Sequence, residues 1–175
     1  IFTEITKTFC DWANENKLSA YDEHTGKGLL RHLYLRRGEV SGEVMVVIVV
    51  NGKDLPNADT LKDKLLSLLG ENLKSLQINL NRKDTNVVLG ENCRVIYGEP
   101  CITDTLCDVK LRISPLSFYQ VNRAMAEKLY GIAKSYAEPK GKTLLDLYCG
   151  TGAIGLSMAK DAESVVGVEI VPSAV

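Results

Sequence analysis

The sequence predicts two segments: an α+β domain over residues 1–116 and the first part of an α/β domain over residues 117–175. Three observations support this. Residues 1–113 combine helical apolar spacing with several short alternating strands, which is typical of an α+β domain with a largely antiparallel sheet. A junction containing Pro115 follows. After the junction come a helix, a strand, a glycine-rich turn, a helix and a second strand, the pattern of a Rossmann-like parallel sheet.

The first segment begins with a helical pattern from residue 1 to about residue 17, whose apolar residues are Phe2, Ile5, Phe9, Trp12 and Ala13. Such spacing is typical of a packing helix, so Phe9 and Trp12 are better explained as core residues than as base-stacking residues. Asn57 is expected to cap a second helix that ends before Gly70. Strands are predicted at 29–37, 44–50, 76–80, 87–89, 94–97, 102–106 and 109–113.

The composition excludes several classes of protein. With 175 residues, 45% of them hydrophobic, the chain can build a packed core of one or two small domains. A formal net charge of −1 gives no overall nucleic-acid signal, so any RNA contact must come from local patches. No apolar run approaches membrane length, and the amphipathic N-terminal segment does not have the pattern of a signal peptide. Five cysteines without metal-ligand spacing indicate reduced thiols, and we expect a cytoplasmic protein with no metal site.

The glycine-rich turn reads Gly150-x-Gly152-x-x-Gly155 and follows a short apolar strand. This spacing suits two cofactors. In an NAD(P)-dependent oxidoreductase the glycines let the backbone approach a pyrophosphate. In a methyltransferase the same turn wraps S-adenosyl-L-methionine, and an acid such as Asp146 precedes it. Glu169 directly follows the next predicted strand, 164–168. At that position it could accept hydrogen bonds from both ribose hydroxyls of either cofactor. Asp146 favours the methyl donor, because a carboxylate would repel a pyrophosphate.

The junction upstream of this turn, from Pro115 to Asn122, contains a further candidate residue. Asn122 is expected to cap a helix that runs to about Ala137. Gln120 lies just before that helix, where it could either hold a small polar ligand or satisfy backbone groups. The spacing predicts that the buried side of the helix consists of Met125, Leu129, Ile132, Ala133 and Tyr136.

The densest basic cluster lies on the predicted strand 29–37 and contains Arg31, Arg36 and Arg37. In a regular strand Arg31 and Arg37 share one face, and Arg36 lies on the other face with Tyr34. Basic groups beside an aromatic ring suit contact with RNA. An ordinary solvated strand face explains the same residues equally well.

Four stretches together resemble one family: Gly28-Leu-Leu-Arg-His32, Arg112 through Asn122, Asp146-Leu-Tyr-Cys-Gly-Thr-Gly152 and Val166-Gly-Val-Glu-Ile170. They are similar to the RNA (uracil-5-)-methyltransferases, especially the bacterial 23S ribosomal RNA branch. Ser-Phe-Tyr-Gln-Val-Asn122 is the most specific stretch, because other methyltransferases share the turn and not this sequence. The chain departs from the family pattern at Leu116, where Arg is frequent, and at Ala153, where some members have a cofactor-binding Asn.

The resemblance implies that Gln120, Tyr148 and Glu169 contact S-adenosyl-L-methionine. With the residues of the turn, the predicted cofactor-binding set is Gln120, Asp146, Tyr148, Gly150, Gly152 and Glu169. It also implies that the catalytic cysteine and its base lie in a part of the protein beyond this chain. We therefore expect an inactive internal fragment with no catalytic residue of its own. Cys149 lies inside the cofactor turn with no neighbour placed to activate it, so it is not the expected nucleophile.

The expected partner is RNA, ribosomal rather than transfer RNA, with no membrane contact. The parent protein would form 5-methyluridine. Two alternatives remain open at this point: the NAD(P)-dependent oxidoreductase, and a non-catalytic RNA-binding module. The sequence does not fix an oligomeric state.

Overall fold

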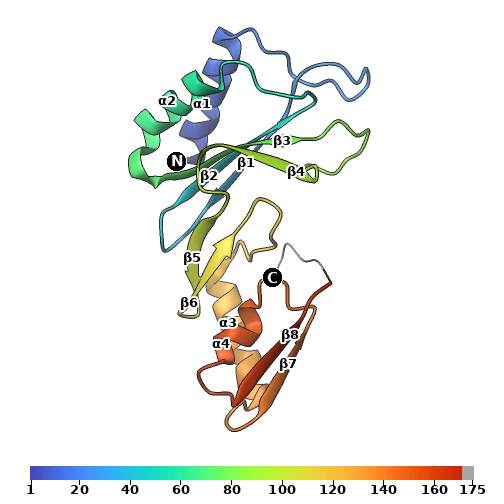
Figure 1. Ribbon diagram of the computed structural model, residues 1–175. Coiled ribbons are helices and arrows are strands. Elements are labelled where there is room, and N and C mark those ends of the chain that lie inside the picture. The colour runs from blue at the N-terminus through green and yellow to red at the C-terminus, as the bar shows by residue number, and fades with distance from the viewer. Residues whose placement is uncertain (171–175) are drawn as a thin grey trace. The chain divides into compact units, whose positions relative to one another are not determined.

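The computed structural model describes residues 1–170, which divide into two units (Figure 1). The first unit contains Ile1–Arg37 and Gly42–Ile102. The second contains the short connection Gly38–Ser41 and the chain from Thr103 onward. In the described part of the chain, no helix has the length and apolarity that crossing a membrane requires.

A four-stranded mixed sheet forms the centre of the first unit, in the order β1 (Leu30–Arg37), β2 (Val44–Val50), β3 (Leu73–Leu80) and β4 (Asn92–Gly98). The two outer pairings are antiparallel, as predicted, whereas β2 and β3 are parallel. A parallel pair requires a crossover connection, which here consists of α2 (Ala58–Leu69) and the 3₁₀ turn η1 (Gly70–Asn72). All residues of the central strand β2 are buried.

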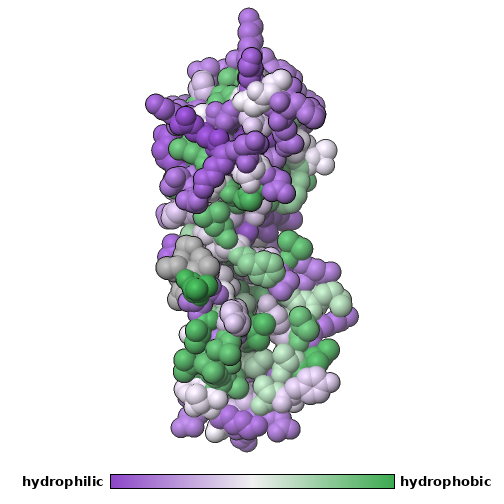
Figure 2. Space-filling view, turned by 90° about the vertical axis from the view of Figure 1, so that its right-hand side faces the viewer, coloured by the Kyte–Doolittle hydropathy of each residue, from purple (hydrophilic) through white to green (hydrophobic). Residues whose placement is uncertain are grey.

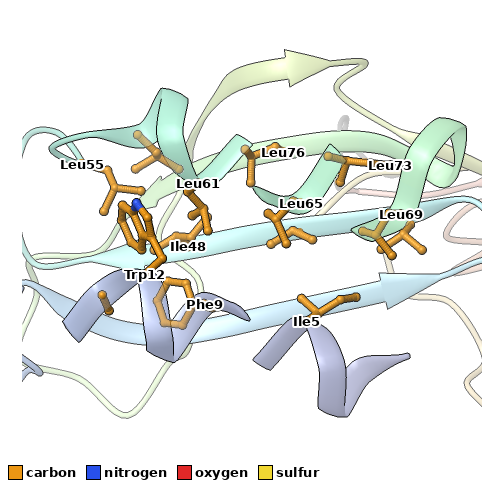
Figure 3. Packing of buried hydrophobic residues seen from close by; sticks show 14 of the residues in the cluster. Ile5, Phe9, Trp12, Ile48, Leu55, Leu61, Leu65, Leu69, Leu73 and Leu76 are labelled. Carbon is orange, nitrogen blue, oxygen red and sulfur yellow. The ribbon is translucent and has the colours of Figure 1, made fainter. Parts of the chain in front are cut away.

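The main core lies where α1 (Phe2–Glu15) and α2 pack on one face of this sheet (Figure 3). Ile5 and Trp12 of α1 have no exposed surface. The Trp12 indole donates a hydrogen bond to the Thr60 hydroxyl of α2 (2.9 Å), and its ring centroid lies 5.8 Å from that of Phe9. The expectation that Phe9 and Trp12 are core residues is therefore confirmed.

The start of α2 differs from the expectation. Asn57 precedes the helix, but its side chain makes no capping hydrogen bond, because its backbone is left-handed (φ 55°) and its amide donates to Asn16 Oδ1 instead (2.7 Å). Thr60 supplies a local contact in its place, donating to the Asn57 carbonyl (2.8 Å). Gly70 lies just past the helix, as predicted, with φ 55°.

The face of β3 that points away from the main core carries buried polar side chains at alternate positions, namely Ser75, Gln77, Asn79 and, just past the strand, Asn81. The Asn79 amide bonds both backbone groups of Gly90, donating to its carbonyl (2.8 Å) and accepting from its N–H (2.6 Å). The Asn81 amide donates to the carbonyl of Val87 (2.7 Å). Residues 87–89, predicted as a strand, are therefore a loop whose backbone is held by side chains.

The second unit contains two small sheets and two helices. β5 (Ile102–Leu106) and β6 (Val109–Ile113) form one sheet, joined by Cys107 and Asp108, which both have positive φ. α3 (Arg123–Ala137) follows, and the Asn122 side chain accepts from Met125 N (3.1 Å), so the predicted cap is confirmed. β7 (Thr143–Leu147), α4 (Ala153–Met158) and β8 (Ser164–Val168) form the predicted β-α-β unit with parallel strands.

The division between the units falls after Ile102, upstream of the boundary that the sequence predicts after residue 116. Packing explains the difference. Leu106 and Leu111 of the β5–β6 hairpin form a buried cluster with Ala126 and Tyr130 of α3, so the hairpin associates with this helix of the second unit. The predicted fold class is nonetheless confirmed: an α+β unit precedes a Rossmann-like β-α-β unit.

The buried side predicted for α3 is wrong. Met125, Leu129 and Ile132 are each more than half exposed, Tyr136 is 85% exposed, and Ala133 is only partly buried. The helix instead buries Ala126 and Tyr130, because the hairpin packs against that side. β7 and β8 likewise expose one apolar face, formed by Leu145, Leu147, Val166 and Val168. Figure 2 shows hydrophobic side chains gathered in the lower part of the view, on the second unit.

Candidate cofactor-binding site

The glycine-rich turn connects β7 to α4 through three residues with positive φ: Tyr148 (60°), Gly150 (55°) and Gly152 (74°). Glycine adopts such angles freely, but a bulky aromatic residue rarely does, and such outliers gather at functional sites. The Gly152 N–H closes the turn on the Cys149 carbonyl (2.8 Å). The turn therefore holds the Tyr148 ring, 88% exposed, beyond the carboxyl end of β7.

Asp146 lies on the side of β7 that faces α4. Its Oδ2 accepts a hydrogen bond from Gly155 N (2.9 Å), which fixes the first turn of the helix to the strand. A Cβ added at Gly155 would lie 2.9 Å from both this oxygen and Val165 Cγ1, so only glycine fits there. Gly155 is thus required by close packing, and Asp146 helps to shape the turn.

Glu169 follows β8 and reaches back to the same turn. Its Oε2 accepts from Gly150 N (2.9 Å), and the turn is further tied to β8 by a bond from Cys149 N to the Val168 carbonyl (3.1 Å). β8 passes so close beneath the turn that a Cβ at Gly167 would lie 2.9 Å from Cys149 Sγ. Two carboxylates, Asp146 and Glu169, therefore bond backbone N–H groups at the two ends of one glycine-rich turn.

Gln120 is partly buried just before α3, and its side chain lies beside the hydroxyl of Tyr130. Burial raises the pKa of Tyr130, the neighbouring Gln120 side chain opposes that shift, and the charge of nearby Asp146 adds to it. Tyr130 thus has both Gln120 and Asp146 as neighbours, although they are far apart in sequence. Binding of a ligand by Gln120 stays a prediction.

Asp104 is a buried acidic residue near the Gln120 segment that was not singled out from the sequence. Its side chain, in a residue only 1% exposed, accepts from the N–H groups of Glu39 (2.9 Å), Val40 (2.9 Å) and Ser41 (3.1 Å). It also accepts from the Tyr119 hydroxyl (3.0 Å). A signal was present in the sequence, because strict alternation in β5 places Asp104 on the buried side between Ile102 and Leu106.

Burial alone would raise the pKa of Asp104, but the hydrogen bonds from Ser41, Glu39 and Tyr119 outweigh it and hold that pKa below its usual value. Burial and the bond to Asp104 in turn raise the pKa of Tyr119 far above its usual range. The pair therefore consists of a carboxylate and a neutral phenol at neutral pH.

The arginines predicted to contact RNA differ in their surroundings. Arg31 lies at a bulge in β1, so the regular alternation on which its predicted face depends does not hold there. Its guanidinium donates to three carbonyls of the loop after β3, those of Asn81 (3.0 Å), Lys83 (2.8 Å) and Thr85 (3.1 Å), and lies 4.4 Å from the centroid of the Tyr21 ring. Arg31 is thus part of the scaffold of this loop.

Arg36 and Arg37 end β1 on alternate sides. Arg36 Nε donates to the Tyr34 hydroxyl (2.7 Å), so these two residues share a face, as predicted. Arg37 is exposed and lines a shallow cavity with Ile1 and Asn72 at the end of the sheet. Contact of these residues with RNA stays a prediction.

Thiols and acids do not assemble elsewhere into an obvious reactive centre. Residues 1–170 contain no group of three His, Cys, Asp or Glu side chains that could hold a metal ion. Cys10, Cys93, Cys101, Cys107 and Cys149 are all free thiols, and Cys149 Sγ lies 3.8 Å from the Gly150 carbonyl oxygen.

Comparison with known proteins matches residues 41–175 to the model of the tRNA (uracil-5-)-methyltransferase family. The chain belongs to this family. It is 44% identical over 165 residues to an uncharacterized RNA methyltransferase of Staphylococcus epidermidis, an alignment that covers 94% of this chain and 36% of that protein. It is 42% identical to one from Halalkalibacterium halodurans, with coverage of 98% and 38%. The chain therefore spans less than two fifths of these relatives.

A solved structure of the same type is that of the Pyrococcus abyssi tRNA (uracil-54, C5)-methyltransferase, in complex with S-adenosyl-L-homocysteine. The Pyrococcus enzyme and the present chain are 28% identical, and their structures superpose with a TM-score of 0.76. The match covers 96% of the present chain and 40% of the Pyrococcus enzyme. Membership of the family confirms the resemblance found in the sequence, and it favours a methyl donor over a nicotinamide cofactor at the glycine-rich turn.

Proposed function

We propose that this chain forms the methyl-donor side of an S-adenosyl-L-methionine-dependent RNA methyltransferase that makes 5-methyluridine. The observation that supports it best is the turn in which Glu169 and Asp146 flank Gly150 and Gly152 at the carboxyl ends of two parallel strands. Ligands of α/β sheets bind at this edge. S-adenosyl-L-methionine is the cofactor that the family uses, and it supplies an electrophilic methyl group on a sulfonium.

Each site residue has a distinct task in this proposal. The Glu169 carboxylate accepts from Gly150 N through one oxygen and has further lone pairs to accept from the ribose hydroxyls. The exposed Tyr148 ring would contact the cofactor, and the amide of Gln120 would bind one of its polar groups. Asp146 holds the turn in shape through Gly155.

The chemical steps at uracil need side chains that the resemblance assigns to another part of the protein. C5 of uracil is a poor nucleophile, so a cysteine thiolate first adds to C6 and the resulting enolate attacks the methyl group. A general base of the protein then removes the C5 proton, and the cysteine thiolate is eliminated from C6. None of the described residues is proposed for these steps, so the 175-residue chain is expected to transfer no methyl group.

We propose 23S ribosomal RNA as the substrate, on the basis of the stretches that resemble that bacterial branch. The family model and the Pyrococcus enzyme are named for transfer RNA, so transfer RNA is the competing substrate. The RNA methyltransferases of higher identity leave the kind of RNA open in their names.

Methyl transfer from labelled S-adenosyl-L-methionine tests the proposal, with 23S RNA and transfer RNA transcripts as parallel substrates. The full-length parent protein should label the 23S transcript at uridine C5, and this chain alone should label neither. Label in transfer RNA only would overturn the choice of substrate, and turnover by the chain alone would contradict the assignment of the nucleophile to another region.

The role of Glu169 separates an enzyme from a non-catalytic RNA-binding module. In the parent protein, Glu169→Ala should raise the KM for S-adenosyl-L-methionine at least tenfold, because a charge-assisted hydrogen bond is worth about 1.5–3 kcal/mol. RNA binding should keep its affinity and its salt dependence. An RNA-binding module would lose nothing measurable in the variant.

A further inference from the structure

The segment that carries Gln120 has little apolar burial apart from the Tyr119 ring, which packs against the buried cluster of the β5–β6 hairpin and α3. Val121 is fully exposed and Phe118 is 73% exposed, so the side chains on both sides of Tyr119 and Gln120 contribute little packing. A segment of this kind keeps one conformation only if polar contacts fix it, because ordering its backbone costs conformational entropy.

Polar contacts fix the segment at its two ends. Upstream, the hydroxyls of Ser114 and Ser117 lie 2.7 Å apart, and each accepts from the backbone N–H of the other residue. Downstream, Asn122 caps α3, and Arg123 Nε donates to the Thr105 carbonyl (3.2 Å). Between these ends, the bond from the Tyr119 hydroxyl to Asp104 is the contact next to Gln120 in the chain.

Asp104 suits this task because its own position is fixed. Three successive backbone N–H groups, those of Glu39, Val40 and Ser41, hold its carboxylate in a buried site. Gly38 begins that loop, and a Cβ there would lie 3.0 Å from the Thr103 carbonyl, so the loop approaches β5 closely. A buried carboxylate bonded in this way cannot turn aside without leaving N–H groups unsatisfied.

We propose that Asp104 is a positioning residue for the methyl-donor site: by holding the Tyr119 hydroxyl, it fixes the direction of Gln120. The donor-site part of this inference rests on the proposed function. Neither Asp104 nor Tyr119 is expected to touch the cofactor. Gln120 is the residue proposed to contact the cofactor. Its backbone follows that of Tyr119, and its side chain lies beside Tyr130.

Hydrogen exchange of this 175-residue chain tests the mechanical part. Tyr119→Phe removes the hydroxyl and keeps the ring, so backbone amides of residues 118–121 should exchange at least tenfold faster than in the native chain. Tyr136→Phe, at an 85% exposed position, is the matched control and should leave these rates unchanged. Trp12 fluorescence, which reports on the first unit, should give the same unfolding midpoint in both variants.

Kinetics of the full-length parent protein test the functional part. Tyr119→Phe should raise the KM for S-adenosyl-L-methionine about tenfold and lower kcat less than threefold, and Asp104→Asn should act in the same direction. A general loss of structure would instead lower the active fraction and leave KM unchanged. If exchange at 118–121 or the KM stays at the native value in Tyr119→Phe, the inference is wrong. If the native protein neither binds nor uses S-adenosyl-L-methionine, the proposed function fails, and the exchange result still decides whether Asp104 orders the segment.

Discussion

The two units treat their apolar residues in opposite ways. In the first unit, helices α1 and α2 bury Ile5, Trp12, Leu61 and Leu65 against a sheet whose strand β2 has no exposed residue. In the second unit, β7 and β8 have α4 on one face and expose leucine and valine side chains on the other. Parallel strands of α/β proteins usually have both faces covered.

The contrast shows that similar sequence patterns have different structural meanings in the two units. An apolar stripe on α1 is a core stripe, whereas the stripe of Met125, Leu129 and Ile132 on α3 is surface among the described residues. Stability of the first unit should thus come mainly from packing. The second unit should depend more on specific backbone contacts around the glycine-rich turn.

The largest expected change in unfolding free energy is found by comparing substitutions of two leucines. Leu65→Ala removes a fully buried side chain of the first unit and should cost about 2–5 kcal/mol of unfolding free energy. Leu145→Ala, at a position 62% exposed, should change it by no more than about 0.5 kcal/mol. Urea unfolding followed by Trp12 fluorescence and by circular dichroism measures both. A large loss in Leu145→Ala would show that the face of β7 is covered in solution.

A pair of glycines tests the backbone contacts of the second unit. Gly155→Ala forces a methyl group against Asp146 Oδ2 and Val165 Cγ1, and should destabilise this unit by about 1–3 kcal/mol. Gly131→Ala, in open space on α3, should instead stabilise the unit by up to about 1 kcal/mol. Thermal unfolding followed by far-ultraviolet circular dichroism distinguishes the two. Equal effects of the two substitutions would mean that the close approach at Gly155 is relaxed in solution.

Two arginines of β1 test which basic residues are structural. Arg31→Ala leaves three loop carbonyls without their donor and should cost about 1–2 kcal/mol. Arg37→Ala should leave stability within about 0.5 kcal/mol of the native value. If Arg37 contacts RNA, its removal should also reduce the salt dependence of RNA binding in the parent protein. A stable Arg31→Ala variant with weakened RNA binding would return Arg31 to the set of RNA-contacting residues.

Lowering the pH should weaken the second unit by protonating Asp104, and this is the smallest of the four expected effects. Because its pKa is lower in the folded chain than its usual 3.8, ionised Asp104 stabilises the fold above that value. The stabilisation is lost as pH falls through the lower, folded-state pKa. Exchange at residues 39–41 should therefore quicken beyond its intrinsic pH dependence below about pH 4, and Asp104→Asn should remove this excess. An unchanged excess in that variant would assign the acid response to another group.

Sequence patterns predicted the local structure better than the tertiary contacts. The bounds of β2 and β8 agree residue for residue with the predicted strands, because continuous apolar runs between turn residues have few alternatives. The glycine-rich turn could be predicted equally well, since its residues are contiguous in the sequence. The side of α3 that is buried depends on where the β5–β6 hairpin packs, which helical spacing alone does not determine.

The remaining differences also arise from contacts distant in sequence. The register of β1 shifts at Arg31, and a single extra residue of this kind leaves no clear mark on alternation. Residues 87–89 have strand-like composition, but the Val87 carbonyl accepts a hydrogen bond from the side chain of Asn81, just past β3. At the candidate site, Asp146, Gly150 and Glu169 lie together as predicted, whereas the partners of Gln120 are Tyr130 and, through Tyr119, Asp104.

The polar row on β3 has a consequence for how the loop after it can vary. The side chains of Asn79 and Asn81 bond backbone atoms of Gly90, Val87 and Lys83. The contacts that Arg31 makes with this loop are likewise to backbone carbonyls. A loop anchored by its main chain keeps its path when its side chains are replaced. Gly90 is the exception, because a Cβ there would lie 2.1 Å from the Leu80 carbonyl. Apart from Thr85, whose hydroxyl accepts from Val87 N (3.2 Å), side chains of residues 82–89 should therefore be replaceable without a change in the path of the loop.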